Sequence, residues 1–283
     1  GGGGMGGGMV RQPSAIDSDG RAGPGARVGR TRGPKAALAL LVCLAAGPGL
    51  AQDIEPAATD ALRAMGRHLA MLQRFEMTAD TAMEVVLDSD QKLLIGGTVF
   101  YQVRRPDGLR IDLATDVVHR ELYYDGKTAA YVSPDEGYYA LIEDPPPTIA
   151  DLLAQAAGRH GLSFPAADLF AWGGPDEPVD QIHEAFLVGP AMIGDVSVNH
   201  WAFRGPDQDW ELWIRRDDPP LPLRASLVDR DELARPRFTT SFAWKEQADI
   251  PDAVFSFAPA EGAKQIMLGS VPVEGTTQQG DKP

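Results

Sequence analysis

The side chains best suited to catalysis or metal binding lie along this chain without the spacing that such chemistry needs. No two of the five histidines have the i, i+4 spacing that places two imidazoles on one face of a helix, and none is accompanied by a cysteine. They are His68, His119, His160, His183 and His200. We therefore predict no metal site and no cofactor. His200 lies in a run that alternates like a strand, so we expect it to pair with an acidic side chain across a sheet.

Motifs of covalent and phosphate chemistry are also missing from the sequence. No serine lies in a G-x-S-x-G elbow, and the glycines of residues 1–8 lack the strand, turn and helix that a nucleotide-binding loop requires. Asp217 and Asp218 are followed by Pro219, so a turn explains this carboxylate pair. We predict no catalytic residue and a protein that is not an enzyme. A hydrolase with a dispersed site remains an alternative, because glycosidase carboxylates meet only in the folded chain.

The charge balance limits the partners. The 283 residues carry 26 basic and 40 acidic side chains, for a net charge of −14 at pH 7. A field of this sign repels phosphate backbones and anionic membrane surfaces. We therefore expect no nucleic-acid partner.

Residues 30–51 have the order of a secretory signal peptide. Basic residues precede an apolar run at residues 36–46, and Gly49-Leu50-Ala51 supplies small residues for cleavage after Ala51. The run is far shorter than the ~20 residues that span a bilayer, so we expect no permanent membrane span. Cys43 follows Leu40 as in a lipoprotein signal, but Val42 stands where a small residue is required. Residues 1–29 form a predicted disordered leader, with Val28 an alternative start.

Beyond the signal, one helix precedes a long run of strands. Residues 57–73 place Leu62, Met65, Leu69 and Leu72 on one helical face, with Thr59 or Asp60 as the expected cap. Six alternating segments follow between residues 75 and 142, separated by turns and without crossover helices, which predicts an antiparallel meander. The two adjacent glycines, Gly96 and Gly97, predict a bend or a bulge.

The apolar face of such a meander must be covered. Helices are predicted at residues 148–160, capped by Thr148, and at residues 165–171. Five further strands are expected between residues 182 and 245, then a helical turn at residues 250–254 and a last strand from residues 255–257. We interpret residues 52–268 as a single domain and residues 269–283 as a disordered tail. Trp210 and Trp213 are separated by an odd number of residues, so they should lie on opposite faces of their strand, with an exposed ring half-covered by an arginine.

Four segments carry a resemblance to a known family. They are VRRPDGLRIDL, YYDGKTAAYVSPDEGYYA, WELWIRRDDPPLPLR and IPDAVFSFAPAEGAKQI, in this order. Together they resemble the DUF2092 family of predicted periplasmic proteins and, more distantly, the LolA/LolB lipoprotein-carrier superfamily, over roughly residues 55–268. The resemblance implies an α+β fold: a strongly curved antiparallel sheet, an incomplete β-barrel, with helices forming a lid over an apolar cavity. In the carriers that cavity holds acyl chains.

The predicted function follows from this cavity. We expect a non-enzymatic periplasmic protein that binds a hydrophobic small molecule, a lipid or a lipidated protein. The alternative is a protein-interaction or envelope-sensing module with no bound ligand. Buried apolar residues also serve as plain core, so each lining residue has that second interpretation. The predicted lining residues are Phe75, Met77, Met83, Val85, Leu93, Ile95, Val99 and Tyr101 from the sheet, and Leu152, Leu153 and Phe170 from the lid.

Overall fold

A computed structural model describes residues 54–175 and 177–270, all of which belong to one unit of the chain, residues 52–283. The predicted leader, the signal peptide and most of the predicted tail lie outside the described residues. The helices are α1 (Pro56–Met71) and α2 (Ile149–His160), with 3-10 helices η1 (Ala167–Phe170), η2 (Pro178–Gln181) and η3 (Asp252–Phe255). The strands are β1 (Arg74–Val86), β2 (Lys92–Arg104), β3 (Gly108–Thr115), β4 (His119–Tyr124), β5 (Ala129–Ser133), β6 (Tyr138–Ile142), β7 (Glu184–Ile193), β8 (Val196–Arg204), β9 (Gln208–Arg215), β10 (Pro222–Asp229), β11 (Arg237–Glu246) and β12 (Lys264–Gln265).

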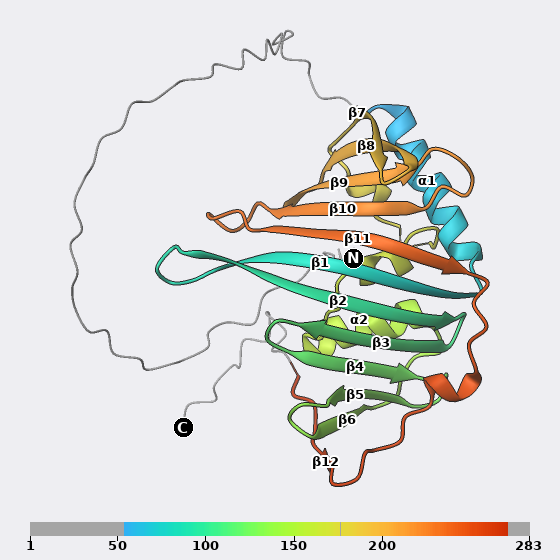
Figure 1. The fold of residues 1–283 in the computed structure, drawn as a ribbon, viewed down its shortest axis with the longest axis vertical. Helices are drawn as coiled ribbons and strands as arrows, with labels where there is room; N and C mark the ends of the chain where they lie inside the picture. The colour runs from blue at the N-terminus through green and yellow to red at the C-terminus, as the bar shows by residue number, and fades with distance from the viewer. Residues whose placement is uncertain (1–53, 176, 271–283) are drawn as a thin grey trace, which may run out of the picture. The chain divides into compact units, whose positions relative to one another are not determined.

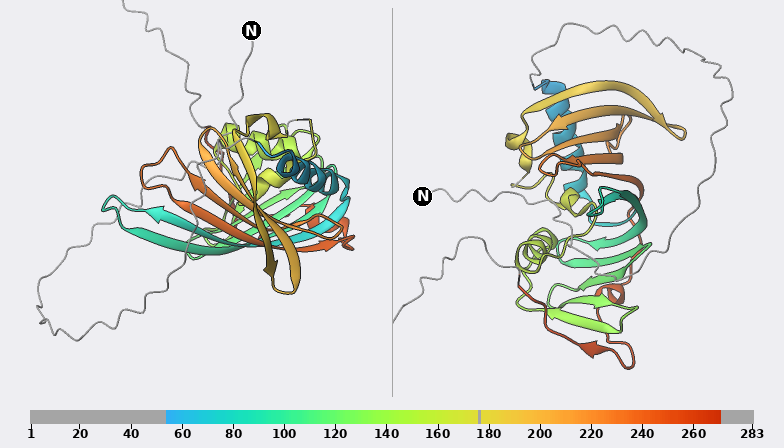
Figure 2. Two further views of the ribbon diagram at one scale, coloured as in Figure 1. Left: turned by 90° about the horizontal axis from the view of Figure 1, so that it is seen from above. Right: turned by 90° about the vertical axis from the view of Figure 1, so that its left-hand side faces the viewer.

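The strands form one curved sheet that does not close on itself (Figure 1). Its order is β12-β6-β5-β4-β3-β2-β1-β11-β10-β9-β8-β7. Two antiparallel meanders, β1 to β6 and β7 to β11, meet where β1 pairs with β11. Helices α1 and α2 lie on the concave side of this sheet (Figure 2). The predicted fold class, an incomplete antiparallel barrel with a helical cover, is confirmed.

Period-two alternation explains which side of the sheet is covered. On β1, Phe75, Met77 and Ala79 are buried, while Glu76 and Thr78 between them are partly exposed. The register places Met77 opposite Tyr101 on β2 and opposite Trp244 on β11. Apolar residues of three neighbouring strands thus form one continuous concave surface.

Helix α1 buries the predicted stripe, because Leu62, Met65, Leu69 and Leu72 are all buried. The predicted cap at Thr59 or Asp60 is wrong. The helix begins earlier, at Pro56, where the fixed φ of proline suits a first helical position. The Thr59 hydroxyl instead donates to the Pro56 carbonyl at 3.0 Å.

Helix α2 begins and ends as expected. The Thr148 hydroxyl oxygen accepts a hydrogen bond from the Asp151 amide at 3.2 Å, and Gly161 ends the helix in the left-handed conformation. The four buried residues of α2 are the predicted inward face, Ile149, Leu152, Leu153 and Ala156. The predicted helix at residues 165–171 is the 3-10 helix η1.

A close backbone approach fixes α1 against the loop after η1. A Cβ atom added at Gly173 would lie 2.1 Å from the Gly66 carbonyl oxygen, and one added at Gly66 would lie 2.7 Å from the Gly173 amide nitrogen. Gly66 costs roughly 1 kcal/mol of helix propensity relative to alanine. The contact with Gly173 explains why this position nevertheless holds glycine.

Three strand predictions need correction. The register runs unbroken through residues 96–97, so the bulge, one of the two alternatives predicted there, is absent; Gly97 lies where β3 approaches closely. Residues 255–257 do not begin a strand, because η3 extends to Phe255 and the last strand is β12, which pairs in parallel with β6. The strand expected to end near residue 187 continues to Ile193, since an irregularity at Val188 accommodates the following Gly189-Pro190.

The convex face confirms both expectations for the β8–β9 region. His200 contacts the Glu211 carboxylate on the next strand at 2.9 Å. Trp213 stacks on His200 with ring centroids 4.0 Å apart, and the Arg224 guanidinium lies 5.7 Å from its ring. Trp210 stacks on Phe203, which belongs to the buried core, so the two tryptophans do lie on opposite faces.

Candidate ligand-binding face and its helical cover

Seven of the predicted lining residues lie together between the concave face and the helices. Each is less than a tenth exposed and belongs to the same hydrophobic core. They are Phe75, Met77, Val99 and Tyr101 from β1 and β2, and Leu152, Leu153 and Phe170 from the helical segment. The helical segment, defined here as residues 146–175, therefore covers the middle of the concave face.

The covered part of this face is filled by side chains. Phe170 lies over the sheet with ring centroids 6.3 Å from Phe75 and 5.7 Å from Tyr101. The gap beside it has a volume of about 10 Å³, which is at the limit for a single water molecule. It is lined by Leu69, Phe75, Met77, Arg105, Leu169, Phe170 and Trp244. A hydrocarbon chain would enter here only if Phe170 and its neighbours moved.

The other four predicted residues lie at an uncovered end of the same face. Met83, Val85 and Ile95 are partly exposed, and Leu93 is 37% exposed. They form two cross-strand pairs, Met83 with Ile95 and Val85 with Leu93, where the β1–β2 hairpin extends beyond the helices (Figures 1 and 2). The pair Thr81 and Gly97 separates them from Ala79 and Val99 of the core. Apolar residues thus reappear beyond that pair, at a solvent-accessible end of the same face.

Two tyrosines of the concave face hold the helical segment at both sides of α2. The Tyr101 hydroxyl donates to the Pro165 carbonyl and the Tyr124 hydroxyl donates to the Pro146 carbonyl, each at 2.5 Å. Desolvation raises the pKa of both phenols, so they remain protonated donors. The sequence predicted Tyr101 as a lining residue, but it did not indicate that tyrosine hydroxyls hold the cover.

Removing either hydroxyl should loosen the cover. A buried hydrogen bond contributes about 1 kcal/mol, which is about a fivefold change in a local opening equilibrium. We expect amide hydrogen exchange of residues 149–164 to accelerate by about that factor in Tyr101→Phe and in Tyr124→Phe. Tyr139→Phe is the control, because among the described residues its hydroxyl has a hydrogen bond only with Gln265, at 3.4 Å. Equal exchange rates in all three variants would contradict the role of these tyrosines.

Asp168, within the cover, carries a carboxyl group that is a weaker acid than usual. Surrounding protein raises its pKa from 3.8 to about 6, although solvent still reaches the residue. Contact with solvent screens this charge, so the free energy attached to the shift is smaller than for a fully buried carboxylate. The folded chain nevertheless retains this proton more firmly than the unfolded chain.

This shift predicts the sign of a pH effect. Because the folded state binds more protons between pH 3.8 and about 6, ionisation of Asp168 lowers stability as pH rises through that window. Asp168→Asn keeps the neutral form throughout. We expect its melting temperature to equal that of the wild type near pH 4 and to exceed it at pH 7.5. A difference that stays constant from pH 4 to pH 7.5 would show that the shift is absent.

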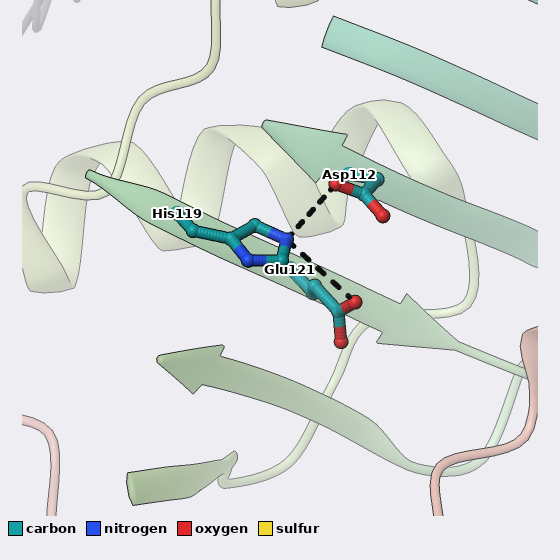
Figure 3. A group of neighbouring side chains, drawn as sticks. All are labelled: Asp112, His119 and Glu121. Carbon is teal, nitrogen blue, oxygen red and sulfur yellow. Dashed lines mark hydrogen bonds and ion pairs between the residues drawn. The ribbon is translucent and has the colours of Figure 1, made fainter. Parts of the chain in front are cut away.

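The convex face holds a cluster that the sequence analysis did not identify. Figure 3 shows the His119 ring between Asp112 and Glu121, with Nε2 at 3.1 Å from the Asp112 carboxylate and 4.0 Å from that of Glu121. The three ligand atoms lie within 4.8 Å of one another. The signal was available, because His119 and Glu121 share a strand face and Asp112 lies on the preceding strand.

A cation of the protein already neutralises this cluster. The Arg110 guanidinium lies 3.1 Å from the Glu121 carboxylate and 3.7 Å from that of Asp112. The Tyr123 hydroxyl donates to the second Glu121 oxygen at 2.9 Å. A metal ion would have to displace or repel Arg110, so we interpret the cluster as an ion-pair network that stabilises the β3–β4 pair.

A larger cleft lies outside the apolar face. It has a volume of about 650 Å³ and is lined by the outer side of α1, the β9–β10 turn and the end of β11. Arg67 and His68 face Asp218 and Glu246 across it, and His68 Nε2 contacts the Glu246 carboxylate at 2.8 Å. Its lining therefore mixes charged side chains with apolar ones such as Met71 and Pro219, whereas the gap beside Phe170 is lined mainly by apolar side chains.

Solved structures similar to this chain share little sequence with it. The lipoprotein LppX of Mycobacterium tuberculosis has 13% identity and a TM-score of 0.46, over 70% of this chain and 100% of that protein. An uncharacterised conserved protein of Thermus thermophilus has 12% identity and a TM-score of 0.43, over 75% and 99%. A LolA superfamily protein of Nitrosomonas europaea has 10% identity and a TM-score of 0.33, over 71% and 97%.

Comparison with curated proteins gave no match. Within residues 54–175 and 177–270, no helix has the length and apolar character needed to cross a bilayer. A family model does match, over residues 58–269, and its description is predicted periplasmic protein (DUF2092). This match spans the whole sheet and its helical cover, and the chain therefore belongs to the DUF2092 family.

Proposed function

We propose that this protein is a non-enzymatic periplasmic binder of a hydrophobic ligand, such as a lipid or the acyl chain of a lipidated protein. One observation carries the proposal. Along β1 and β2 the concave face runs from the core under Phe170, past one cross-strand pair of Thr81 and Gly97, to the uncovered apolar end at Met83 and Leu93. An uncovered apolar surface on the same sheet face as a covered one is suited to a chain-like guest.

The energetics of displacing the cover favour this proposal. Losing the packing of Phe170 costs about 3–5 kcal/mol, as judged from the removal of buried aromatic rings. A hydrocarbon chain gains ~0.8 kcal/mol for each methylene that it buries, or ~8 kcal/mol for ten of them. The free energy gained by burying a long acyl chain therefore exceeds the cost of displacing Phe170, whereas that gained by burying a short chain does not.

Chain length gives a direct test of binding. We expect a fluorescent fatty acid with a chain of about 16 carbons to bind the purified protein with a stoichiometry of one and to be displaced by unlabelled lipid. Probes of about 6 carbons should not bind, because they bury too few methylenes to offset Phe170. Absence of uptake of the long probe, in protein freed of endogenous lipid by refolding, would refute the proposal.

Export is the second part of the proposal. The signal peptide predicted at residues 30–51 is expected to be removed after Ala51. Protein recovered from the periplasmic fraction should begin at Gln52 by N-terminal sequencing. Retention in the cytoplasm with residues 1–51 intact would contradict it.

The charged cleft beside α1 favours a second candidate, a protein-interaction module. Its volume of about 650 Å³ and its mixed charges suit a polar partner segment better than an acyl chain. Under this alternative a protein would co-purify in stoichiometric amount with no bound lipid. Arg67→Glu should then abolish co-purification while leaving uptake of the long probe unchanged.

A further inference from the structure

Arg105 is a cation of the concave face without an acidic partner among the described residues. Its guanidinium lines the gap beside Phe170 and lies 5.7 Å from that ring. One terminal nitrogen donates to the Leu69 carbonyl at a long 3.4 Å, and the buried Nε has no hydrogen-bond partner. Desolvation lowers the pKa of Arg105 and no acidic side chain raises it. A charge in this setting is stabilised when an anion arrives.

The neighbouring residue, Arg104, differs from Arg105 because it forms ion pairs with acidic side chains. Arg104 points to the other face of the sheet, where it contacts the carboxylates of Asp107 at 3.0 Å and Asp252 at 2.9 Å. Two consecutive arginines thus differ in their surroundings, one in an ion-pair network and one beside apolar side chains. The chain provides abundant carboxylates, yet none pairs with Arg105 in the described residues.

We propose that Arg105 binds the anionic head of an amphiphile whose hydrocarbon chain lies along the concave face. The shared chemistry is an oxyanion, a carboxylate or a phosphate, which the planar guanidinium can bind through two parallel hydrogen bonds. Phe75, Met77 and Phe170 line the same gap and would contact the first methylenes. This inference rests on the proposed function and adds the chemical class of the ligand head.

Three probes with the same 16-carbon chain separate the head from the chain: palmitate, hexadecyl phosphate and hexadecanol. Hydrogen bonds to a charged group contribute about 1.5–3 kcal/mol, so at least one anion should bind about tenfold or more tightly than the alcohol. Palmitate and hexadecyl phosphate together distinguish a carboxylate site from a phosphate site. Titrations belong at a fixed ionic strength of about 0.15 M, because the net charge of −14 repels anions at low salt.

Variants then assign the preference to Arg105. In Arg105→Gln the affinities for anion and alcohol should agree within about twofold, and Arg105→Lys should restore part of the preference. Arg215→Gln is the matched control, since Arg215 also has a buried Nε without a partner but does not line the gap. Its preference for the anion should be that of the wild type.

The outcomes separate the two proposals. Equal binding of all three probes to the wild type would overturn the role of Arg105 and leave the proposed function intact. An equal loss of all three probes in Arg105→Gln, with a folded protein by circular dichroism, would assign Arg105 a structural role only. Binding of none of the probes to the wild type would overturn the proposed function itself.

Discussion

Replacing Phe170 by alanine is expected to lower the free energy of unfolding by about 3–5 kcal/mol, the usual cost of removing a buried phenylalanine ring. Phe170 is 6% exposed and contacts Phe75, Tyr101 and the Arg105 guanidinium. The same variant should bind a long apolar probe more tightly than the wild type, because the ring no longer has to be displaced. Urea unfolding and probe titration measure the two effects on one preparation.

Phe255→Ala is the matched control for this variant. Phe255 is fully buried and lies 4.9 Å from the Arg104 guanidinium, on the convex side of the sheet. Its removal should destabilise the protein by a similar amount, about 3–5 kcal/mol, without tighter probe binding. If both variants show the same increase in affinity for the probe, general loosening of the protein, rather than space under the cover, would explain the increase.

Gly173→Ala is the second substitution with a large expected effect. The residue has φ of +78°, and the new Cβ would lie 2.1 Å from the Gly66 carbonyl oxygen. The left-handed conformation costs roughly 1–2 kcal/mol for alanine, and overpacking adds about 1–3 kcal/mol. We expect a loss of about 3 kcal/mol in urea unfolding, together with separation of α1 from the loop that follows η1.

Gly137→Ala distinguishes the two parts of that cost. Gly137 has φ of +69°, but a Cβ there would meet nothing within 4 Å. Only the roughly 1–2 kcal/mol of the left-handed conformation should be lost. Equal destabilisation by Gly173→Ala and Gly137→Ala would show that α1 and the loop do not depend on their close backbone contact.

Local patterns predicted much of the fold. Alternation located the concave face on β1 and β2, and the Thr148 cap located the start of α2. The parity of Trp210 and Trp213 placed their rings on opposite faces. These features depend on residues close in sequence, whose geometry is set by the period of the strand or helix.

Features that depend on distant residues were not predictable in the same way. The parallel pairing of β12 with β6 joins segments more than a hundred residues apart, and a two-residue strand has no period to detect. The extension of β7 to Ile193 was not predicted, because Pro190 is a residue type that is common in turns and rare within strands. The lack of an acidic partner for Arg105 among the described residues depends on its surroundings in space. Arg104, the adjacent residue of the same type, has two such partners, so residue type alone does not predict this property.

The candidate site shows the same division. The sequence identified an apolar face, and the structure brings Phe75, Tyr101 and Phe170 into contact there. Whether such residues leave room for a guest depends on side-chain volumes summed across the sheet and its cover. The gap of about 10 Å³ means that binding requires movement of the cover.

Native mass spectrometry of protein isolated gently from the cell envelope detects a bound hydrophobic ligand directly, without the choice of a probe. We expect a one-to-one adduct that organic solvent extracts as an amphiphile with a long hydrocarbon chain, and faster amide exchange of residues 149–164 in the loaded protein. Recovery of only the unliganded mass from the envelope, together with failure of the emptied protein to bind envelope lipids, would contradict it.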